Sequence, residues 1–309
     1  MKKDFNPLKL DSGETVFFKR QLEHIKTGAY DKKYKELKAT MLFPVSTEAS
    51  PGARTITFRS FSKVGLAKIV SDYANDFPRV DVYAEEKTAN VRSIGESYGY
   101  SIQEIRESQM AGTNLDSRRA SAARRTNDEK VNDIAFNGDD DYGLQGFINY
   151  PGITEYTIPN GAGGDEEWST KTPDEIVADV SGIITAVIDL TNGREVPDTL
   201  LLPIAQYNIL INVRMTDGDS NNILNFIMKN NPYLSSIEWV TEMKGAGVGG
   251  ADRMMVYPRD PEHVTLEIPQ PFEQLAAQQK GMEFVIPCHS RCGGIIVYYP
   301  LAVAYGDNI

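Results

Sequence analysis

Cysteine and histidine are scarce in this sequence, and their scarcity excludes several kinds of site. The 309 residues include 2 cysteines and 3 histidines. Cys288 and Cys292, four positions apart, cannot build a disulfide framework. The segment 288–292 (CHSRC) offers three ligands where structural zinc takes four, and His24 and His263 lie far away in sequence. With so few histidines and no G-x-S-x-G motif, acyl-transfer chemistry has little to use. We therefore predict no enzyme activity, no cofactor and no metal.

Positive charge and long apolar runs are also lacking. The chain has 32 Lys and Arg against 43 Asp and Glu, a net charge of -11. This balance argues against a protein that binds nucleic acid by neutralising phosphates, so we expect only weak, non-specific contact with DNA. No apolar run approaches the roughly 20 residues of a membrane-spanning helix, and the start of the chain lacks the apolar middle of a signal peptide. We expect synthesis in the cytoplasm and no membrane partner.

The first part of the chain predicts an extended arm followed by an apolar β-segment. The hydrophobic fraction of 41% and the charged fraction of 24% are typical of a folded protein. Residues 1–52 mix charged and apolar positions and end in a Ser-Pro-Gly turn. Alternation over Thr55–Phe61 predicts a strand, and a second is expected near Thr88–Ser93. The segment between them is too apolar for a solvated loop and predicts contact with a partner. Its apolar residues are Val64, Leu66, Ile69, Val70, Tyr73, Phe77 and Val80.

Two helices are expected in the middle of the chain. Ser101 and Glu104 have the spacing of a capping box, which predicts a short helix ending at Gly112. A longer helix is predicted over 115–137, with Gly138 as its stop. The early apolar positions of this helix are small alanines, which let another backbone approach closely.

The second half indicates an α+β domain. Thr172-Pro173-Asp174-Glu175 combines an N-cap, a proline at the first helical position and a capping-box glutamate, and an apolar face follows until Asn192-Gly193. Residues 199–203 predict a buried strand, and Ser220 is the expected cap of a further helix. From Ser236 onward, short apolar segments predict a series of strands.

One glycine-rich loop matches a nucleotide-binding pattern. Gly245, Gly247 and Gly250 fit G-x-G-x-x-G, whose glycines let a pyrophosphate approach a helix N-terminus. The following residues, 254–258, have a strand pattern, so the helix dipole that a phosphate needs is missing. A loop between strands is the favoured interpretation, and a nucleotide-binding enzyme is kept as an alternative.

Several segments resemble one protein family. The chain is similar to the major capsid proteins of tailed bacteriophages, whose fold is shared with bacterial encapsulins. The resemblance covers most of the chain. It rests on 93–105 (SIGESYGYSIQEI), 109–112 (QMAG), 122–125 (AARR), 129–132 (EKVN), 143–149 (GLQGFIN) and 293–300 (GGIIVYYP).

The resemblance implies an organisation into five segments. Their expected order is an N-terminal arm (1–52), an extended loop over a neighbouring subunit (53–100), a peripheral domain whose spine is the long helix (101–169), an axial domain (170–258), and strands that return to both sheets (259–309). The loop with Gly245, Gly247 and Gly250 is then expected near the capsomer axis.

The function that the resemblance implies is self-assembly and not catalysis. We expect hexamers and pentamers of this chain in an icosahedral virion shell around double-stranded DNA, assembled in the host cytoplasm. Portal and scaffolding proteins are implied as partners, and a decoration protein is allowed. The apolar residues of the extended loop would contact neighbouring subunits. The helix arginines Arg118, Arg119, Arg124 and Arg125 are expected either to contact DNA or a neighbour, or to form a locally paired helix surface. An encapsulin-type compartment around a cargo enzyme remains an alternative.

Overall fold

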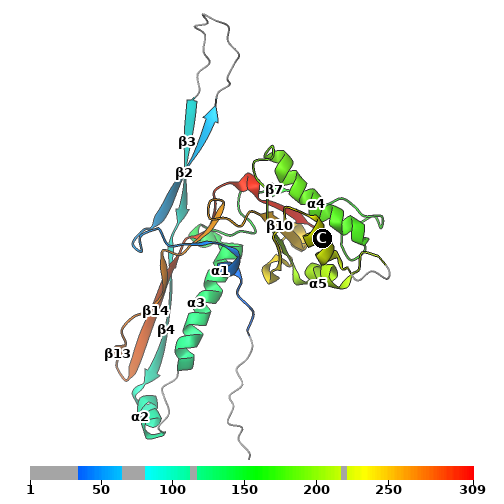
Figure 1. Cartoon of the computed structure of the whole chain (residues 1–309). Coiled ribbons are helices and arrows are strands. Elements are labelled where there is room, and N and C mark those ends of the chain that lie inside the picture. The colour runs from blue at the N-terminus through cyan, green and yellow to red at the C-terminus, as the bar shows by residue number, and fades with distance from the viewer. Residues whose placement is uncertain (1–33, 65–80, 112–116, 217–220) are drawn as a thin grey trace, which may run out of the picture. The chain divides into compact units, whose positions relative to one another are not determined.

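The computed structural model describes residues 34–64, 81–111, 117–216 and 221–309 (Figure 1). The chain divides into two compact units, Met1–Glu36 and Leu37–Ile309, and the elements below belong to the second unit. The expected subunit contacts at Leu66, Ile69, Tyr73, Phe77 and Val80 lie outside the described residues. Val64 is the last residue of a strand.

Strands β2 (Thr55–Val64) and β3 (Asp81–Asn90) form a long antiparallel hairpin. Their register runs from Thr55 opposite Asn90 to Val64 opposite Asp81. The predicted strand over 55–61 is thus confirmed. Residues 88–93, where a second strand was expected, contain the end of β3 and the start of a further strand, separated by the buried Val91.

That next strand, β4 (Arg92–Ser101), pairs along all ten of its residues with β14 (Glu283–Cys292). The other edge of β14 pairs with β12 (Gln270–Gln274) and β13 (Gln278–Lys280). Helix α2 (Ile102–Ala111) begins directly after β4. Its capping box is confirmed: the Ser101 N–H donates to Glu104 Oε2 at 3.0 Å, and the Glu104 N–H donates to Ser101 Oγ at 3.0 Å.

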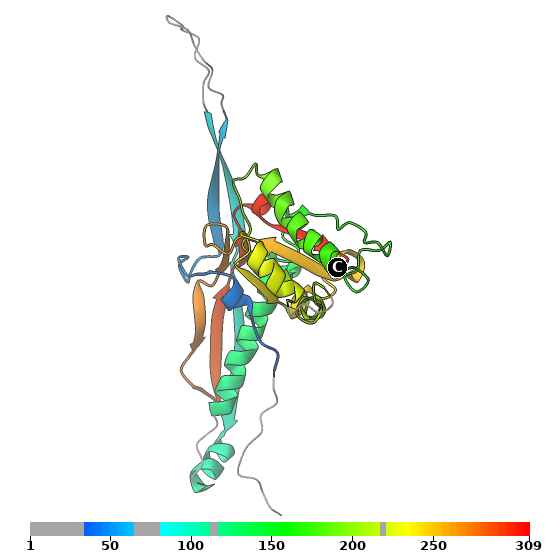
Figure 2. The same ribbon diagram turned by 45° about the vertical axis from the view of Figure 1, so that its right-hand side comes forward.

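The predicted long helix is α3 (Ser117–Asn137), which packs along β4 and β14 (Figures 1 and 2). It ends where Gly138 adopts a φ of 75°, as expected for a glycine stop. A short helix, α1 (Ala39–Leu42), docks on it, because Asn132 Oδ1 accepts the Lys38 and Ala39 N–H groups at 3.1 and 3.0 Å. Leu42 and Phe43 are fully buried, so this part of the predicted arm is anchored in the core.

A five-stranded mixed sheet carries the second core. Its strands, in the order β7-β16-β10-β8-β9, are Thr154–Glu155, Ala304–Asp307, Arg253–Tyr257, Thr199–Leu202 and Ser236–Trp239. Helix α4 (Pro173–Leu190) packs on it with the expected capping box and a fully buried apolar face. That face consists of Ile176, Val180, Ile183, Ile184 and Val187.

Two further helices complete this part of the chain. Helix α5 (Ile204–Asn212) was not expected from the sequence. Helix α6 (Ile223–Asn230) is capped by Asn222, whose Oδ1 accepts the Asn225 N–H at 2.8 Å, so the expected cap at Ser220 is wrong.

The first hydrophobic core contains the aromatic residues Phe43, Phe136, Phe147 and Tyr257. A three-stranded sheet and a two-stranded sheet contribute residues to it. The strands of the three-stranded sheet, in the order β1-β11-β15, are Val45–Ser46, Val264–Glu267 and Gly294–Val297, and the two-stranded sheet pairs β5 (Gly138–Asp139) with β6 (Leu144–Gln145). No helix in the described ranges is long and apolar enough to cross a membrane.

Candidate assembly surfaces and buried polar sites

The β2–β3 hairpin is a two-stranded sheet to which no other described strand adds. None of its side chains that the structure describes is buried, and Val82 is 61% exposed. Cross-strand pairs hold it together: Arg59 Nε lies 2.7 Å from Glu86 Oε1, and the Thr57 and Thr88 hydroxyls are 3.2 Å apart. Near its base, the Phe58 ring meets the Tyr298 ring edge-on at 5.1 Å. The hairpin therefore contacts the rest of the chain near its base, and none of its described side chains is buried.

Among the spine arginines, Arg119 and Arg125 form ion pairs with glutamates of the same chain. Arg119 Nη2 lies 2.8 Å from Glu104 Oε1, and Arg119 also donates to the Gly99 carbonyl. The hydrogen bond from Arg119 is the main reason why the pKa of Glu104 falls to about 2. Arg125 Nε lies 2.8 Å from Glu129 Oε1, one helical turn away.

The side chains of Arg118 and Arg124 are exposed. The charge of Arg124 acts on Asp128, where it opposes the rise that burial causes in the pKa of this carboxyl. Local pairing thus accounts for Arg119 and Arg125.

The glycine loop uses its backbone amides internally. The Gly245 N–H donates to Asp252 Oδ1 and the Val248 N–H to Asp307 Oδ2, each at 2.9 Å. A Cβ on Gly247 would lie 2.6 Å from the Asp307 carboxyl carbon, so glycine is required there. The loop is followed by strand β10 and not by a helix. Two of the backbone N–H groups that a phosphate would need already donate to the carboxylates of Asp252 and Asp307. The arrangement gives the nucleotide-binding alternative no support.

A buried ion pair fastens this loop to the sheet. Arg253 in β10 and Asp307 in β16 are 6% and 8% exposed. Arg253 Nε lies 2.6 Å from Asp307 Oδ1, and Nη2 lies 2.8 Å from Oδ2. The third guanidinium nitrogen donates to the Ile148 carbonyl at 2.6 Å. The Arg253 guanidinium thus joins β10 to β16 and to the turn at Ile148. Through Asp307, which also accepts the Val248 N–H, the pair is connected to the glycine loop.

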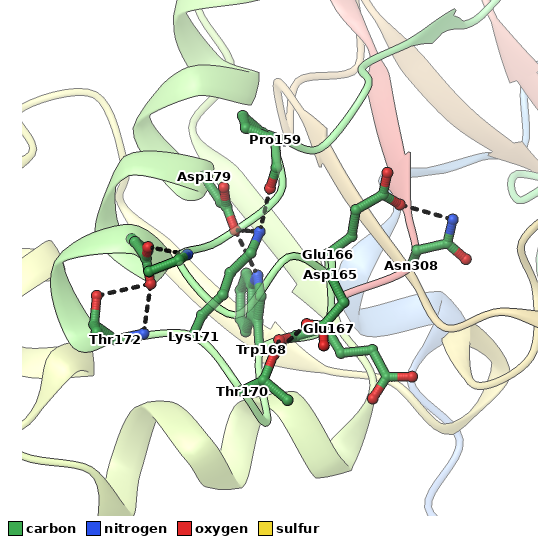
Figure 3. A network of polar contacts seen from close by, with 12 residues as sticks. Pro159, Asp165, Glu166, Glu167, Trp168, Thr170, Lys171, Thr172, Asp179 and Asn308 are labelled. Carbon is green, nitrogen blue, oxygen red and sulfur yellow. Dashed lines mark hydrogen bonds and ion pairs between the residues drawn. The ribbon is translucent and has the colours of Figure 1, made fainter.

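A second buried network anchors the loop before α4 (Figure 3). Lys171 Nζ donates to Asp179 Oδ2 and to the Pro159 carbonyl, both at 2.7 Å. The indole N–H of Trp168, which is 1% exposed, donates to the same Asp179 oxygen at 3.0 Å. Burial raises the pKa of Asp179, although the hydrogen bond from Lys171 opposes this rise. The polar segment between Pro159 and Lys171 is thus held at both ends against α4.

Both cysteines are free and buried in β14. Burial raises the pKa of the Cys292 thiol to about 11 and also raises that of Cys288. In the part of the chain that the structure describes, no group of three or more His, Cys, Asp or Glu side chains is placed to hold a metal ion.

Comparisons with known proteins agree with this architecture. The family model described as "Major capsid protein" matches residues 65–309. Among solved structures, the capsid of Myoviridae phage XM1 shares 18% identity, covers 96% of this chain and 99% of that chain, and has a TM-score of 0.80. The capsid of an empty GTA particle shares 10% identity over 96% and 99% of the two chains, with a TM-score of 0.69. The virus-like particle from Pyrococcus furiosus shares 13% identity over 86% and 90%, with a TM-score of 0.53.

No curated protein matches the chain in sequence. The structural likenesses show the fold, which is the expected α+β fold of phage capsid proteins and encapsulin-like particles. The family match covers well over half of the chain. The chain therefore belongs to the major capsid protein family, and it is a structural subunit of a virion shell and not an enzyme.

Proposed function

We propose that copies of this chain assemble into hexamers and pentamers, and that these close an icosahedral shell around double-stranded DNA in the host cytoplasm. Portal and scaffolding proteins are the partners that such a shell needs for DNA entry and for control of its size, and a decoration protein is compatible with it. Repeated weak contacts between copies supply the stability of the closed assembly.

The hairpin β2–β3 is the observation that carries this proposal. An isolated two-stranded hairpin is at best marginally stable in water, because it buries too little surface. This hairpin pairs ten residues on each strand, and no third described strand covers it. A neighbouring copy that lies against it supplies the missing cover, so the hairpin becomes stable when the shell forms.

An encapsulin-type compartment uses the same fold to hold a cargo enzyme. Two observations favour the virion. The matching family model is that of major capsid proteins, and the TM-score to the phage XM1 capsid, 0.80, exceeds the 0.53 to the Pyrococcus furiosus particle. Nuclease-resistant DNA inside shells purified from infected cells supports the virion, whereas a co-purifying enzyme in place of DNA supports the compartment.

A shortened hairpin tests the proposal. Ser60 and Glu85 are directly paired, so residues 61–84 can be replaced by Asn-Gly, the dipeptide that best closes a two-residue hairpin. We expect the full chain to form closed shells in negative-stain images and sedimentation runs. The shortened chain should keep its circular dichroism spectrum and melting temperature but stop at monomers or single capsomers. Normal shells from the shortened chain, or a full chain that stays monomeric at high concentration, would contradict the proposal.

A further inference from the structure

An acidic pocket lies between the loop before α4 and the start of α5. Its volume is about 640 Å³. Four carboxylates line it, from Asp165, Glu166, Glu167 and Asp252, and none of the described lining residues is a lysine or an arginine. The Trp168 and Lys171 anchors described above hold the loop that carries three of these acids (Figure 3). The acids are thus presented by a fixed loop, and the pocket has a strong excess of negative charge.

A buried acceptor on the wall of this pocket has no donor. Gln206 lines the pocket and is 7% exposed. Its Nε2 donates to Asp252 Oδ2 at 2.9 Å and to the Ile309 carbonyl at 2.8 Å, and these two bonds fix the orientation of the amide. Its Oε1 is buried and has no partner among the described residues. Buried acceptors are almost always satisfied by protein or by ordered water, so this oxygen calls for a donor from outside the described residues.

The chemistry of the pocket fits an ammonium group. A lysine head has three N–H donors and a full positive charge, which suit a pocket with an excess of carboxylates. A bare metal ion fits less well, because no three acidic side chains in the described ranges converge as ligands. The pocket is also far larger than an ion, and it has room for an extended basic segment.

One segment of the chain has the complementary charge. Residues 1–33 contain eight Lys or Arg, seven of them lysines, against five Asp or Glu, which gives a net charge of +3. The remaining residues contain 24 against 38, a net charge of -14. Fully extended, 33 residues span up to about 110 Å, enough to reach a neighbouring subunit. Lys38 and Ala39, which follow this segment, are bonded to Asn132 of α3 beside the first hydrophobic core. The acidic pocket lies beside the second hydrophobic core.

We propose that the acidic pocket binds lysine side chains from residues 1–33 of a second copy of this chain. The contact rests on the proposed shell function, because it joins two subunits. It also offsets part of the repulsion between acidic subunits, which a net charge of -11 per chain otherwise imposes on a shell.

Zero-length cross-linking tests this contact. A carbodiimide joins a carboxylate to an amine only when the two touch. Shells are assembled from a mixture of ¹⁵N-labelled and unlabelled chains, treated with the carbodiimide, digested and analysed by mass spectrometry. We expect Glu166 or Glu167 linked to lysines of 1–33, with many pairs that join a labelled to an unlabelled peptide.

Three results overturn the inference while leaving the proposed function intact: shells without such links, links only within one isotope class, or links to lysines outside 1–33. The second result would mean that a chain's own arm fills the pocket. A failure to form shells at all would instead overturn the proposed function, and the inference with it.

A pair of matched variants adds a second measurement. Within its loop the Glu167 carboxylate accepts a hydrogen bond from Ser169 Oγ at 3.3 Å, so Glu167→Gln removes charge with little local cost. Asp189, an exposed acid near the end of α4, gives the control Asp189→Asn. We expect a several-fold lower yield of links to 1–33, and shell dissociation at lower salt, for Glu167→Gln alone. Equal yields and equal salt midpoints for the two variants would refute the proposal.

Discussion

Replacing Asp307 with asparagine should destabilise the chain strongly. The change keeps the size of the side chain, so it creates no cavity, but it leaves the Arg253 guanidinium buried without its counter-charge. Both residues are less than a tenth exposed, and two short bonds of 2.6 and 2.8 Å join them. Breaking such a pair from one side costs about 3–5 kcal/mol, because an uncompensated charge stays in the interior. The Val248 N–H also loses a charged acceptor, which loosens the glycine loop.

Urea unfolding of the unassembled chain, at one fixed protein concentration, measures this loss. Two controls separate the cost of the unpaired buried charge from the cost of any substitution in an ion pair. The double variant Arg253→Met with Asp307→Leu removes both charges and should be far closer to the natural chain. Glu86→Gln breaks an ion pair whose side chains are 66% and 57% exposed, and it should cost less than about 1 kcal/mol. If Asp307→Asn costs no more than Glu86→Gln, the reasoning about burial is wrong.

Two further predictions concern glycine and cysteine. Gly138 and Gly193 have nearly the same φ, 75° and 74°, but a Cβ would lie 2.5 Å from the Leu144 carbonyl at Gly138 and would meet nothing within 4 Å at Gly193. Thermal melts should show a loss of about 1–2 kcal/mol for Gly193→Ala from backbone strain alone, and a clearly larger loss for Gly138→Ala; equal losses would contradict the clash. At pH 8 the Cys292 thiol, with a pKa of about 11 and no exposed surface, should not react with Ellman's reagent, whereas both cysteines should react in urea. Rapid reaction of Cys292 in the folded chain would contradict this prediction and would show that β14 opens.

Locally encoded elements could be predicted from the sequence. The helix starts at Ser101 and Thr172 follow from capping boxes whose partners are three residues apart, and the structure confirms both. The apolar face of α4 has helical spacing and is buried as expected. In these places the residues that decide the structure are close neighbours in the chain.

Elements that depend on distant partners could not be predicted. Strand β4 contains Gly95 and Gly99 and has no clear alternation, and its pairing with β14 is encoded by residues near the other end of the chain. Helix α5 buries Gln206 while it exposes Ile204 and Ile211, so its hydrophobic pattern does not mark the face toward the core.

The candidate sites show the same limit. Glu166 and Glu167 are adjacent in sequence, but Gln206 and Asp252 reach the pocket only through tertiary packing. The pairing of Arg119 likewise depends on a glutamate in another helix. The family resemblance supplied the fold and the role as a shell subunit, which the local patterns alone would not have given.

The positions of β14 and β16 determine when the chain can fold during its synthesis. β14 is the partner of the whole of β4, and β16 lies inside the five-stranded sheet between β7 and β10. Neither sheet can be completed until residues 283–307 have left the ribosome. Until then the apolar residues of β10 have an unpaired edge beside them, which makes the nascent chain prone to aggregation and dependent on chaperones. The yield of folded subunits should therefore depend on how well this edge of β10 is shielded until β16 has been made.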